Sequence, residues 1–182
     1  MKKVGVLLSG CGFNDGAEIH ESVLTMLFLD KSGAEMILMA PNIDQMHVIN
    51  HYTGQEMEEY RNVLVESSRI ARGEIKDMAE VTGNDLDALI IPGGFGVAKN
   101  LSDYAMAGSD CSVNPDVYRL IAELRVMEKP IGAICIAPVM MAKILGEQEE
   151  SANMTIGYDE TTSTDILSCL LYTSPSPRDG LL

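Results

Sequence analysis

The sequence predicts an α/β protein with a flavodoxin-like, doubly wound, mostly parallel sheet that carries helices on both faces. Two observations predict this class: short apolar runs rich in Val, Ile and Leu alternate with segments of helical period, and several of these runs end in turns of glycine and small residues. Right-handed crossovers between such strands give a doubly wound sheet, whose functional groups lie at the carboxyl ends of the strands. A chain of 182 residues is long enough for one such domain.

The first predicted strand is KKVGVLLS, which runs into the glycine-rich turn SGCGFNDG. A helix is expected between Asp15, which is placed to cap it, and Gly33, which is placed to stop it. Glu18 lies three residues after Asp15 and completes a capping box. Four apolar residues fall on one face of this helix, and that face is therefore expected to pack on the sheet: Ile19, Val23, Met26 and Leu27.

The remaining elements continue the alternation. The second strand is EMILMAP, and it is followed by a polar excursion that contains His47 and His51. The segment RNVLVESSRIARGEI is expected to be a short extended piece and then a helix. LDALIIPGGFG is the third core strand with a Gly-Gly loop, VNPDVYRLIAELRVMEK is a helix, and PIGAICIA is the fourth core strand with its turn.

Charge and cysteine usage limit the partners. The 27 acidic and 13 basic residues give a net charge of -14, which repels polyphosphates and anionic membranes, so no nucleic-acid or membrane partner is expected. No apolar run approaches the roughly 20 residues that span a bilayer, and the N-terminus becomes polar too early for a secretory signal, which predicts a cytoplasmic protein. The four cysteines form no C-x-x-C pair, so neither a disulfide framework nor a structural metal is expected.

The C-terminal segment 166–182 departs from the pattern. It reads ILSCLLYTSPSPRDGLL, has no helical or strand period and ends in a Ser/Pro cluster. The stretch SCLLYTSPSPRDG resembles translated sequencing-adapter read-through. The expected organisation is therefore one domain over 1–165, truncated at its C-terminus, and a non-native disordered tail over 166–182; a disordered native tail is the alternative.

A single cysteine occupies the turn after the fourth core strand. In GAICIAP, Cys135 stands between small residues at a strand-to-helix turn, which is the form of a nucleophile elbow. A cysteine at a helix N-terminus meets unpaired N–H groups that lower its pKa and favour the thiolate. The same pattern also fits a small buried hydrophobe, and the local sequence leaves both interpretations open.

Five stretches together resemble the ElbB-type branch of the ThiJ/PfpI superfamily, relatives of class I glutamine amidotransferase domains. They are SGCGFNDGAEIHESVLTMLFLDKSGAE, INHYTG, RNVLVESSRIARGEI, LDALIIPGGFGVAKNLSDYA and KPIGAICIAPVMMAKIL. The resemblance implies a flavodoxin-like fold, a homodimer, and a reactive cysteine that is hydrogen-bonded to a glutamate of the first helix. ElbB-type proteins are described as glutathione-independent glyoxalases and are linked to isoprenoid biosynthesis.

Matched by position, the resemblance makes Cys135 the nucleophile and Glu21 its carboxyl partner. Glu18 is the competing carboxyl, but the capping box already gives it a local role. The backbone N–H groups of Gly94 and Ile136 are the expected oxyanion donors, and the glycine lets the backbone approach a substrate.

Other residues are weaker candidates for the pocket. Gly93 either borders the site or only forms the turn after its strand, and Cys11 either faces the crevice as a second thiol or packs in its loop. His20 either lines the pocket or is exposed on the helix. Ile136 follows Cys135 directly and all three histidines precede it, so the usual Cys-His-Glu hydrolytic triad is not expected.

The function that these features predict is a cofactor-independent glyoxalase, a lyase that converts a small 2-oxoaldehyde such as glyoxal to a 2-hydroxy acid through a cysteine hemithioacetal. No metal or soluble thiol is required. Two alternatives remain open: a non-catalytic redox or stress sensor that uses the same cysteine, and an amidotransferase-like subunit that acts with a partner.

Overall fold

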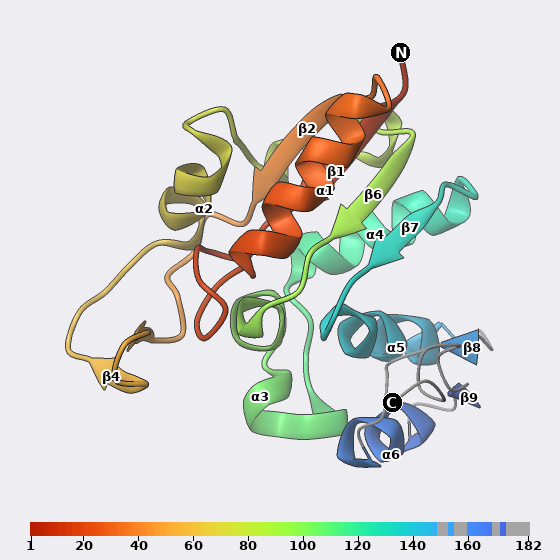
Figure 1. Ribbon diagram of the computed structural model, residues 1–182. Coiled ribbons are helices and arrows are strands. Elements are labelled where there is room, and N and C mark those ends of the chain that lie inside the picture. Colours follow the sequence, from red (N-terminus) through yellow and green to blue (C-terminus); the bar gives the residue numbers. More distant parts are fainter. Residues whose placement is uncertain (149–152, 155–159, 169–171, 174–182) are drawn as a thin grey trace, which may run out of the picture.

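The centre of the computed structural model is a five-stranded parallel sheet with the order β5-β2-β1-β6-β7 (Figure 1). The structure describes residues 1–148, 153–154, 160–168 and 172–173. The strands of the sheet are β1 Lys3–Leu7, β2 Glu35–Ala40, β5 Lys76–Asp77, β6 Ala88–Ile91 and β7 Ile131–Ala133. Because the chain builds the sheet outward from β1 in one direction and then from β6 in the other, this order confirms the predicted doubly wound class.

Helices cover both faces of the sheet. Helices α1 and α2 lie on one face and α4 and α5 on the other, and Figure 1 shows α1 in front of the sheet and α4 behind it. The helices are α1 Ile19–Lys31, α2 Val63–Ala71, α3 Tyr104–Ala107, α4 Pro115–Val126, α5 Ala137–Glu147 and α6 Glu160–Ser168. Single turns are η1 Met78–Glu80, η2 Gly83–Asp85, η3 Val97–Leu101, which is π-helical, and η4 Gly108–Asp110.

Strand β1 divides the core in two, because side chains alternate between the faces of a strand. Leu7 belongs to the larger core, which includes Leu120 of α4 and Ile144 of α5. Val6 and Leu8 belong to the smaller core beneath α1 and α2. A strand buried on both faces reads as a continuous apolar run, which is why KKVGVLLS was recognisable as a central strand.

Helix α1 begins later than the sequence predicted. Glu18 is its N-cap and accepts a hydrogen bond from the Glu21 N–H at 2.7 Å, so the prediction that Asp15 caps the helix is wrong. Asp15 is 4% exposed, and its carboxylate accepts from the Ile49 N–H at 2.7 Å instead. At the other end the helix stops before Gly33, which has a φ of +73°, as predicted.

The apolar face of α1 does not pack as predicted. Ile19, Val23 and Leu27 are exposed, whereas Ser22 is buried and Leu29 packs against the smaller core. The Ser22 hydroxyl is satisfied by the Glu18 carbonyl at 2.7 Å, which removes the cost of burying it. The rotation of the helix is therefore set by how its N-terminus joins the site loops, and not by its most apolar stripe.

The polar excursion after β2 forms an antiparallel hairpin of β3 Val48–Asn50 and β4 Gln55–Met57. Asn100 of η3 ties the base of this hairpin to the loop after β1. Its side-chain amide donates to the carbonyls of Ser9 and Asp15 at 2.8 and 2.9 Å, and its oxygen accepts from the Met46 N–H at 3.0 Å. One buried side chain therefore fixes three segments that are distant in the sequence.

The structure differs from the predicted domain boundary at residue 165. Helix α6 runs through that boundary to Ser168, and Ile166 is fully buried against Val139, Ala142 and Leu145. Apolar burial therefore keeps at least the start of the predicted tail within the fold. Two further strands, β8 Asn153–Met154 and β9 Tyr172–Thr173, pair in parallel. The rest of the predicted tail, 169–171 and 174–182, lies outside the described residues.

None of the helices in the described ranges combines the length and apolar character that crossing a bilayer requires.

Replacing Asn100 by alanine is expected to lower the free energy of unfolding by about 3 kcal/mol, because the buried carbonyls of Ser9 and Asp15 lose their donor. Denaturant unfolding measures the change. Asn84→Ala, at an exposed position of η2, is the matched control and is expected to change stability by less than about 0.5 kcal/mol. Equal effects of the two substitutions would contradict the bridging role of Asn100.

Candidate active site

The loops after β1 and β6 lie against each other at the point where the winding of the sheet reverses. Three backbone hydrogen bonds join them: Glu18 N–H to the Gly93 carbonyl at 2.9 Å, Phe95 N–H to the Phe13 carbonyl at 2.7 Å, and Gly96 N–H to the Gly16 carbonyl at 2.9 Å. This crevice is where doubly wound proteins usually bind ligands. The candidate catalytic side chains lie beside these two loops, at the end of β7.

Glycine is required where these loops meet the end of β7. A Cβ on Gly93 would overlap the Cβ of Cys135 and would lie 2.7 Å from Oε2 of Glu21. A Cβ on Gly96 would lie 2.5 Å from the backbone oxygen of Ser9. Gly93 therefore lets the β6 loop touch both candidate catalytic side chains, and Gly96 lets the same loop touch the loop after β1.

Cys135 lies in the short turn between β7 and α5. Its φ is +59°, a left-handed conformation that is uncommon for residues other than glycine, and the residue is exposed. The Ile134 N–H still bonds to the Ile91 carbonyl at 3.0 Å, and α5 starts two residues after Cys135 with Pro138 in its first turn. The turn thus has the strained geometry of a nucleophile elbow and presents the thiol outside the sheet.

Glu21, in the first turn of α1, is the carboxyl that reaches the thiol. Its Oε2 accepts from the Gly93 N–H at 2.7 Å, and a Cβ on Gly93 would touch both this oxygen and the Cβ of Cys135. The backbone N–H groups of Gly94 and Ile136 also act on the thiol and lower its pKa. The structure therefore brings together Cys135, Glu21 and the N–H groups of two separate loops.

The thiol is not held as a preformed thiolate. Partial burial, and then the negative charge of Glu21, raise the pKa of Cys135, whereas the N–H groups of Gly94 and Ile136 lower it by less. The sequence predicted a lowered pKa from the helix N-terminus. That effect is present in the Ile136 N–H, but burial and the charge of Glu21 together outweigh it.

Glu18 and His20 lie on the outer side of the same helix turn. Oε1 of Glu18 is 2.9 Å from Nδ1 of His20, whose ring is largely exposed. Burial raises the pKa of Glu18, but hydrogen bonds from the Glu21 N–H and from His20 outweigh it and lower that pKa. Glu18 is therefore a charged cap, while Glu21 is the carboxyl at the sulfur.

The other candidate thiol lies in a different environment. Burial, and then the charge of Glu66, raise the pKa of Cys11, and Arg69 and Arg61 also act on it. These partners belong to α2 and to the segment before it, so Cys11 lies on the α2 side of the β1 loop. Its placement is that of a packed loop cysteine.

The histidines of the excursion contact the β1 loop. His51 donates through Nδ1 to the Ile49 carbonyl at 3.0 Å and accepts at Nε2 from the Asn14 N–H at 3.3 Å. Its Nε2 also lies 3.7 Å from the Asp15 carboxylate. Nε2 of His47 is buried without a hydrogen-bond partner. Within the described ranges, no three side chains of the usual metal-ligating types converge on one point.

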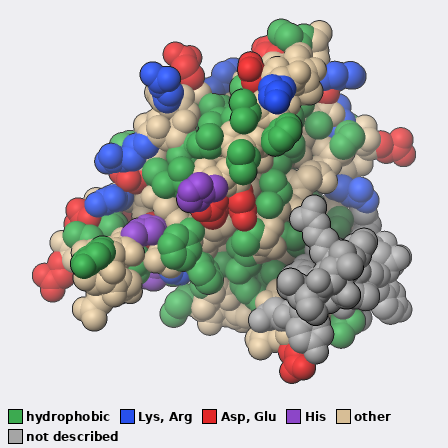
Figure 2. Space-filling view, in the orientation of Figure 1, with side chains coloured by type: hydrophobic (Ala, Val, Ile, Leu, Met, Phe, Trp, Pro, Cys, Tyr) green, Lys and Arg blue, Asp and Glu red, His purple; other side chains and the backbone are tan. Residues whose placement is uncertain are grey.

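An apolar groove of about 410 Å³ runs from Glu21 along the open face of β6 and β7. Its walls are Leu24, Phe28, Ile90 and Ile134, with Thr25 and Leu29. Figure 2 shows hydrophobic side chains over this face and, below them at the end of α1, acidic groups beside a histidine. Sequence reasoning missed this groove because it depends on the rotation of α1.

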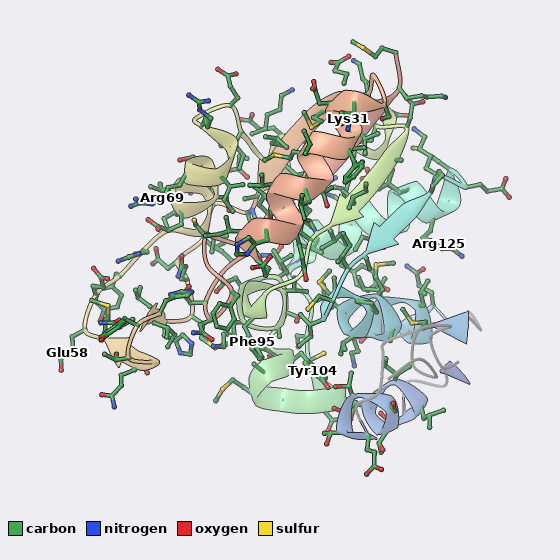
Figure 3. The ribbon with its side chains drawn as sticks, viewed as in Figure 1. Lys31, Glu58, Arg69, Phe95, Tyr104 and Arg125 are labelled. Carbon is green, nitrogen blue, oxygen red and sulfur yellow. The ribbon has the colours of Figure 1, made fainter. Side chains whose placement is uncertain are left out.

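Phe95 is a second feature of the site that sequence reasoning missed, although it lies in the PGGFG motif. It follows Gly94 directly, and 45% of its surface is exposed. Figure 3 shows Phe95 on the side of the N-terminal end of α1 and Lys31 at the opposite end of that helix. An exposed aromatic residue inside a glycine-rich loop was the signal that could have identified it.

Comparisons with known proteins identify relatives over 87% of the chain. It is 49% identical over 159 residues to human (Homo sapiens) glutamine amidotransferase-like class 1 domain-containing protein 3, mitochondrial, covering 87% of this chain and 58% of that protein. It is 47% identical over 159 residues to the rat (Rattus norvegicus) ES1 protein homolog, mitochondrial, with the same coverage. The chain thus spans 58% of the length of these curated relatives. No protein-family model matches the chain.

The location predicted from the sequence is contradicted by these relatives. Both are named as mitochondrial proteins, whereas the sequence predicted a cytoplasmic one. The absence of a recognisable secretory signal is physically unrelated to import into an organelle, so it gave no information on this point.

Solved structures agree with the fold. The crystal structure of an isoprenoid biosynthesis protein with an amidotransferase-like domain from Ehrlichia chaffeensis is 37% identical, with a TM-score of 0.89, and the match covers 97% of this chain and 80% of that one. A ThiJ/PfpI domain protein from Brachyspira murdochii, 14% identical with a TM-score of 0.58 over 96% of this chain and 79% of that one, shares the fold. The chain therefore belongs to the glutamine amidotransferase-like family of the Ehrlichia protein, and it has the ThiJ/PfpI fold.

Proposed function

We propose that this chain is a cofactor-independent glyoxalase that converts small 2-oxoaldehydes to 2-hydroxy acids. The observation that carries the proposal is the meeting of Cys135 and Glu21 at Gly93: a Cβ on Gly93 would overlap the Cβ of Cys135 and would lie 2.7 Å from Oε2 of Glu21. The charge of Glu21 and the N–H groups of Gly94 and Ile136 all act on the pKa of the thiol. A thiol with its own base suits addition to an aldehyde, because the nucleophile is generated only as it attacks.

In the first step, Glu21 takes the thiol proton while the sulfur adds to the aldehyde carbon. The carbonyl double bond becomes an alkoxide, which the N–H groups of Gly94 and Ile136 stabilise. Glu21 then returns the proton to this oxygen. The product is a hemithioacetal on Cys135, and the carboxylate is ready for the next proton.

In the second step, Glu21 removes the hydrogen from the hemithioacetal carbon and delivers it to the neighbouring carbonyl carbon. The hydroxyl proton of the first carbon passes to the oxygen of the second, so the hemithioacetal becomes a thioester of a 2-hydroxy acid without net oxidation. Water then cleaves the carbon–sulfur bond and restores the thiol. The hydrogen bond from the Gly93 N–H holds Glu21 in place throughout.

The positions of the histidines favour this reaction over amide hydrolysis. His20 pairs with Glu18, and His51 contacts Asn14, Asp15 and Ile49, so neither is arranged as a base for the thiol. Amide hydrolysis needs a group that protonates the departing amine, which a histidine normally supplies. Aldehyde addition has no leaving group, and a single carboxyl is sufficient for it.

The proposal includes the location of the protein and its oligomeric state. The human and rat relatives are named as mitochondrial proteins, and one solved relative is described as an isoprenoid biosynthesis protein with an amidotransferase-like domain. We propose a mitochondrial protein that removes reactive aldehydes and acts as a homodimer. The exposed apolar residues of α1 support self-association.

A redox sensor is the second candidate, because the N–H groups at Cys135 would also bind the oxygens of a sulfinate formed by peroxide. The raised pKa of the thiol favours the enzyme, since oxidation requires the thiolate at rest.

Removing either member of the pair is expected to abolish glyoxal turnover. Cys135→Ala should leave no activity, and Glu21→Gln should lower kcat by about 10²- to 10⁴-fold, because the amide cannot transfer protons. Production of the 2-hydroxy acid, measured by chromatography, checks both. Cys11→Ser is the control and should retain activity; turnover that survives in Cys135→Ala would refute the mechanism.

The pH dependence of Cys135 alkylation tests the raised pKa. The reaction of Cys135 with iodoacetamide is followed by peptide mass spectrometry. It should reach half its maximal rate at a pH above the ordinary pKa of a cysteine thiol. Glu21→Gln removes a negative charge, so the midpoint should move to lower pH. Glu35→Gln, at an exposed position of β2, should leave the midpoint unchanged. An identical midpoint in wild type and Glu21→Gln would show that the carboxyl does not act on the sulfur.

A further inference from the structure

All three phenylalanines of the chain are exposed. Phe13 is 49% exposed, Phe28 64% and Phe95 45%, although phenylalanine is usually among the most buried residues. Two of them, Phe13 and Phe95, come from the loops that meet at the candidate site. This placement requires an explanation, because each ring exposes apolar surface at a free-energy cost.

Phe13 and Phe95 belong to two loops that are joined next to Gly94. Phe95 directly follows Gly94, whose N–H lowers the pKa of Cys135 through a hydrogen bond, and the Phe95 N–H donates to the Phe13 carbonyl at 2.7 Å. A group bound to the sulfur with its oxygen at the Gly94 N–H therefore starts one residue away from the Phe95 side chain.

Neighbouring cationic and imidazole groups hold both rings. Nζ of Lys99 lies 5.2 Å from the centre of the Phe95 ring, and it is anchored by the Asn14 carbonyl at 2.6 Å. The ring of His51 meets that of Phe13 edge to face, with centres 5.5 Å apart. Rings that are held in this way lose little conformational freedom when they receive a ligand.

We propose that Phe13 and Phe95 form a subsite for an aromatic or bulky apolar substituent on the carbonyl compound that reacts at Cys135. The subsite rests on the proposed function only in that the bound carbonyl compound reacts at Cys135. Aryl 2-oxoaldehydes are then better substrates than glyoxal. If the phenyl substituent covers about half of one ring, the apolar area that is buried corresponds to about a tenfold preference in kcat/KM over glyoxal.

The test uses alkylation, so that it does not depend on turnover. The rate constants of Cys135 with iodoacetamide and with 2-iodo-N-phenylacetamide are measured by peptide mass spectrometry; in each reaction the sulfur displaces iodide and loses its proton. The phenyl-to-unsubstituted ratio is divided by the ratio for free N-acetylcysteine. Wild type should show a normalised ratio of about ten, and Phe95→Ala and Phe13→Ala about one to three.

Tyr60→Ala is the matched control, because Tyr60 is also an exposed aromatic residue, 96% exposed, and lies between β4 and α2, outside the loops after β1, β6 and β7. It should keep the wild-type ratio. A ratio that is unchanged in Phe95→Ala and Phe13→Ala overturns the subsite, and so does a ratio that falls as protein concentration rises, which would assign the rings to a contact between copies.

Measurements of aldehyde turnover then distinguish the proposed subsite from the proposed glyoxalase activity. Phe95→Ala should lower kcat/KM for phenylglyoxal about tenfold and change kcat/KM for glyoxal less than twofold. A changed alkylation ratio without any aldehyde turnover would retain the subsite and reject the glyoxalase. Turnover of both aldehydes with no loss in Phe95→Ala would reject the subsite and retain the glyoxalase.

Discussion

The close contact between the loops after β1 and β6 is the constraint on which the rest of the site depends. Hydrogen bonds from Glu18 to Gly93 and from Gly96 to Gly16 bring the two backbones together, and only glycine fits where Gly93 meets Cys135. The same contact sets the start of α1, since the residue that bonds to Gly93 is also the helix cap. The helix therefore presents Glu21 to the sulfur and turns apolar residues toward solvent.

Placing a carboxyl beside a thiol determines the chemistry available to both. Burial and the negative charge of Glu21 raise the pKa of Cys135, so the resting nucleophile is a thiol that lies beside its base. Such a pair is slow to react with oxidants and alkylating agents that need a free thiolate. It is well suited to a reaction in which the same proton must move several times between sulfur, oxygen and carbon.

Several parts of the fold were predictable because they depend on local physics. Strand periodicity located β1, β2, β6 and β7, and Asn114 with Pro115 marks the start of α4 as expected for a cap followed by proline. The packing face of α1 was wrong because it depends on distant backbone contacts. The hairpin was missed because its strands have three residues each and are fixed by Asp15 and Asn100.

The sequence by itself determined the doubly wound sheet, the strand ends that carry the site, and the candidacy of Cys135 in its small-residue turn. These follow from periodicity, from turn chemistry and from motif order, which are properties of neighbouring residues. Only the tertiary structure decided that Glu21 reaches the sulfur while Glu18 caps the helix, and that the thiol has a raised pKa. Those properties depend on which groups come into contact across the loops after β1, β6 and β7. These groups are distant in the sequence, so the pattern of neighbouring residues does not show which of them meet.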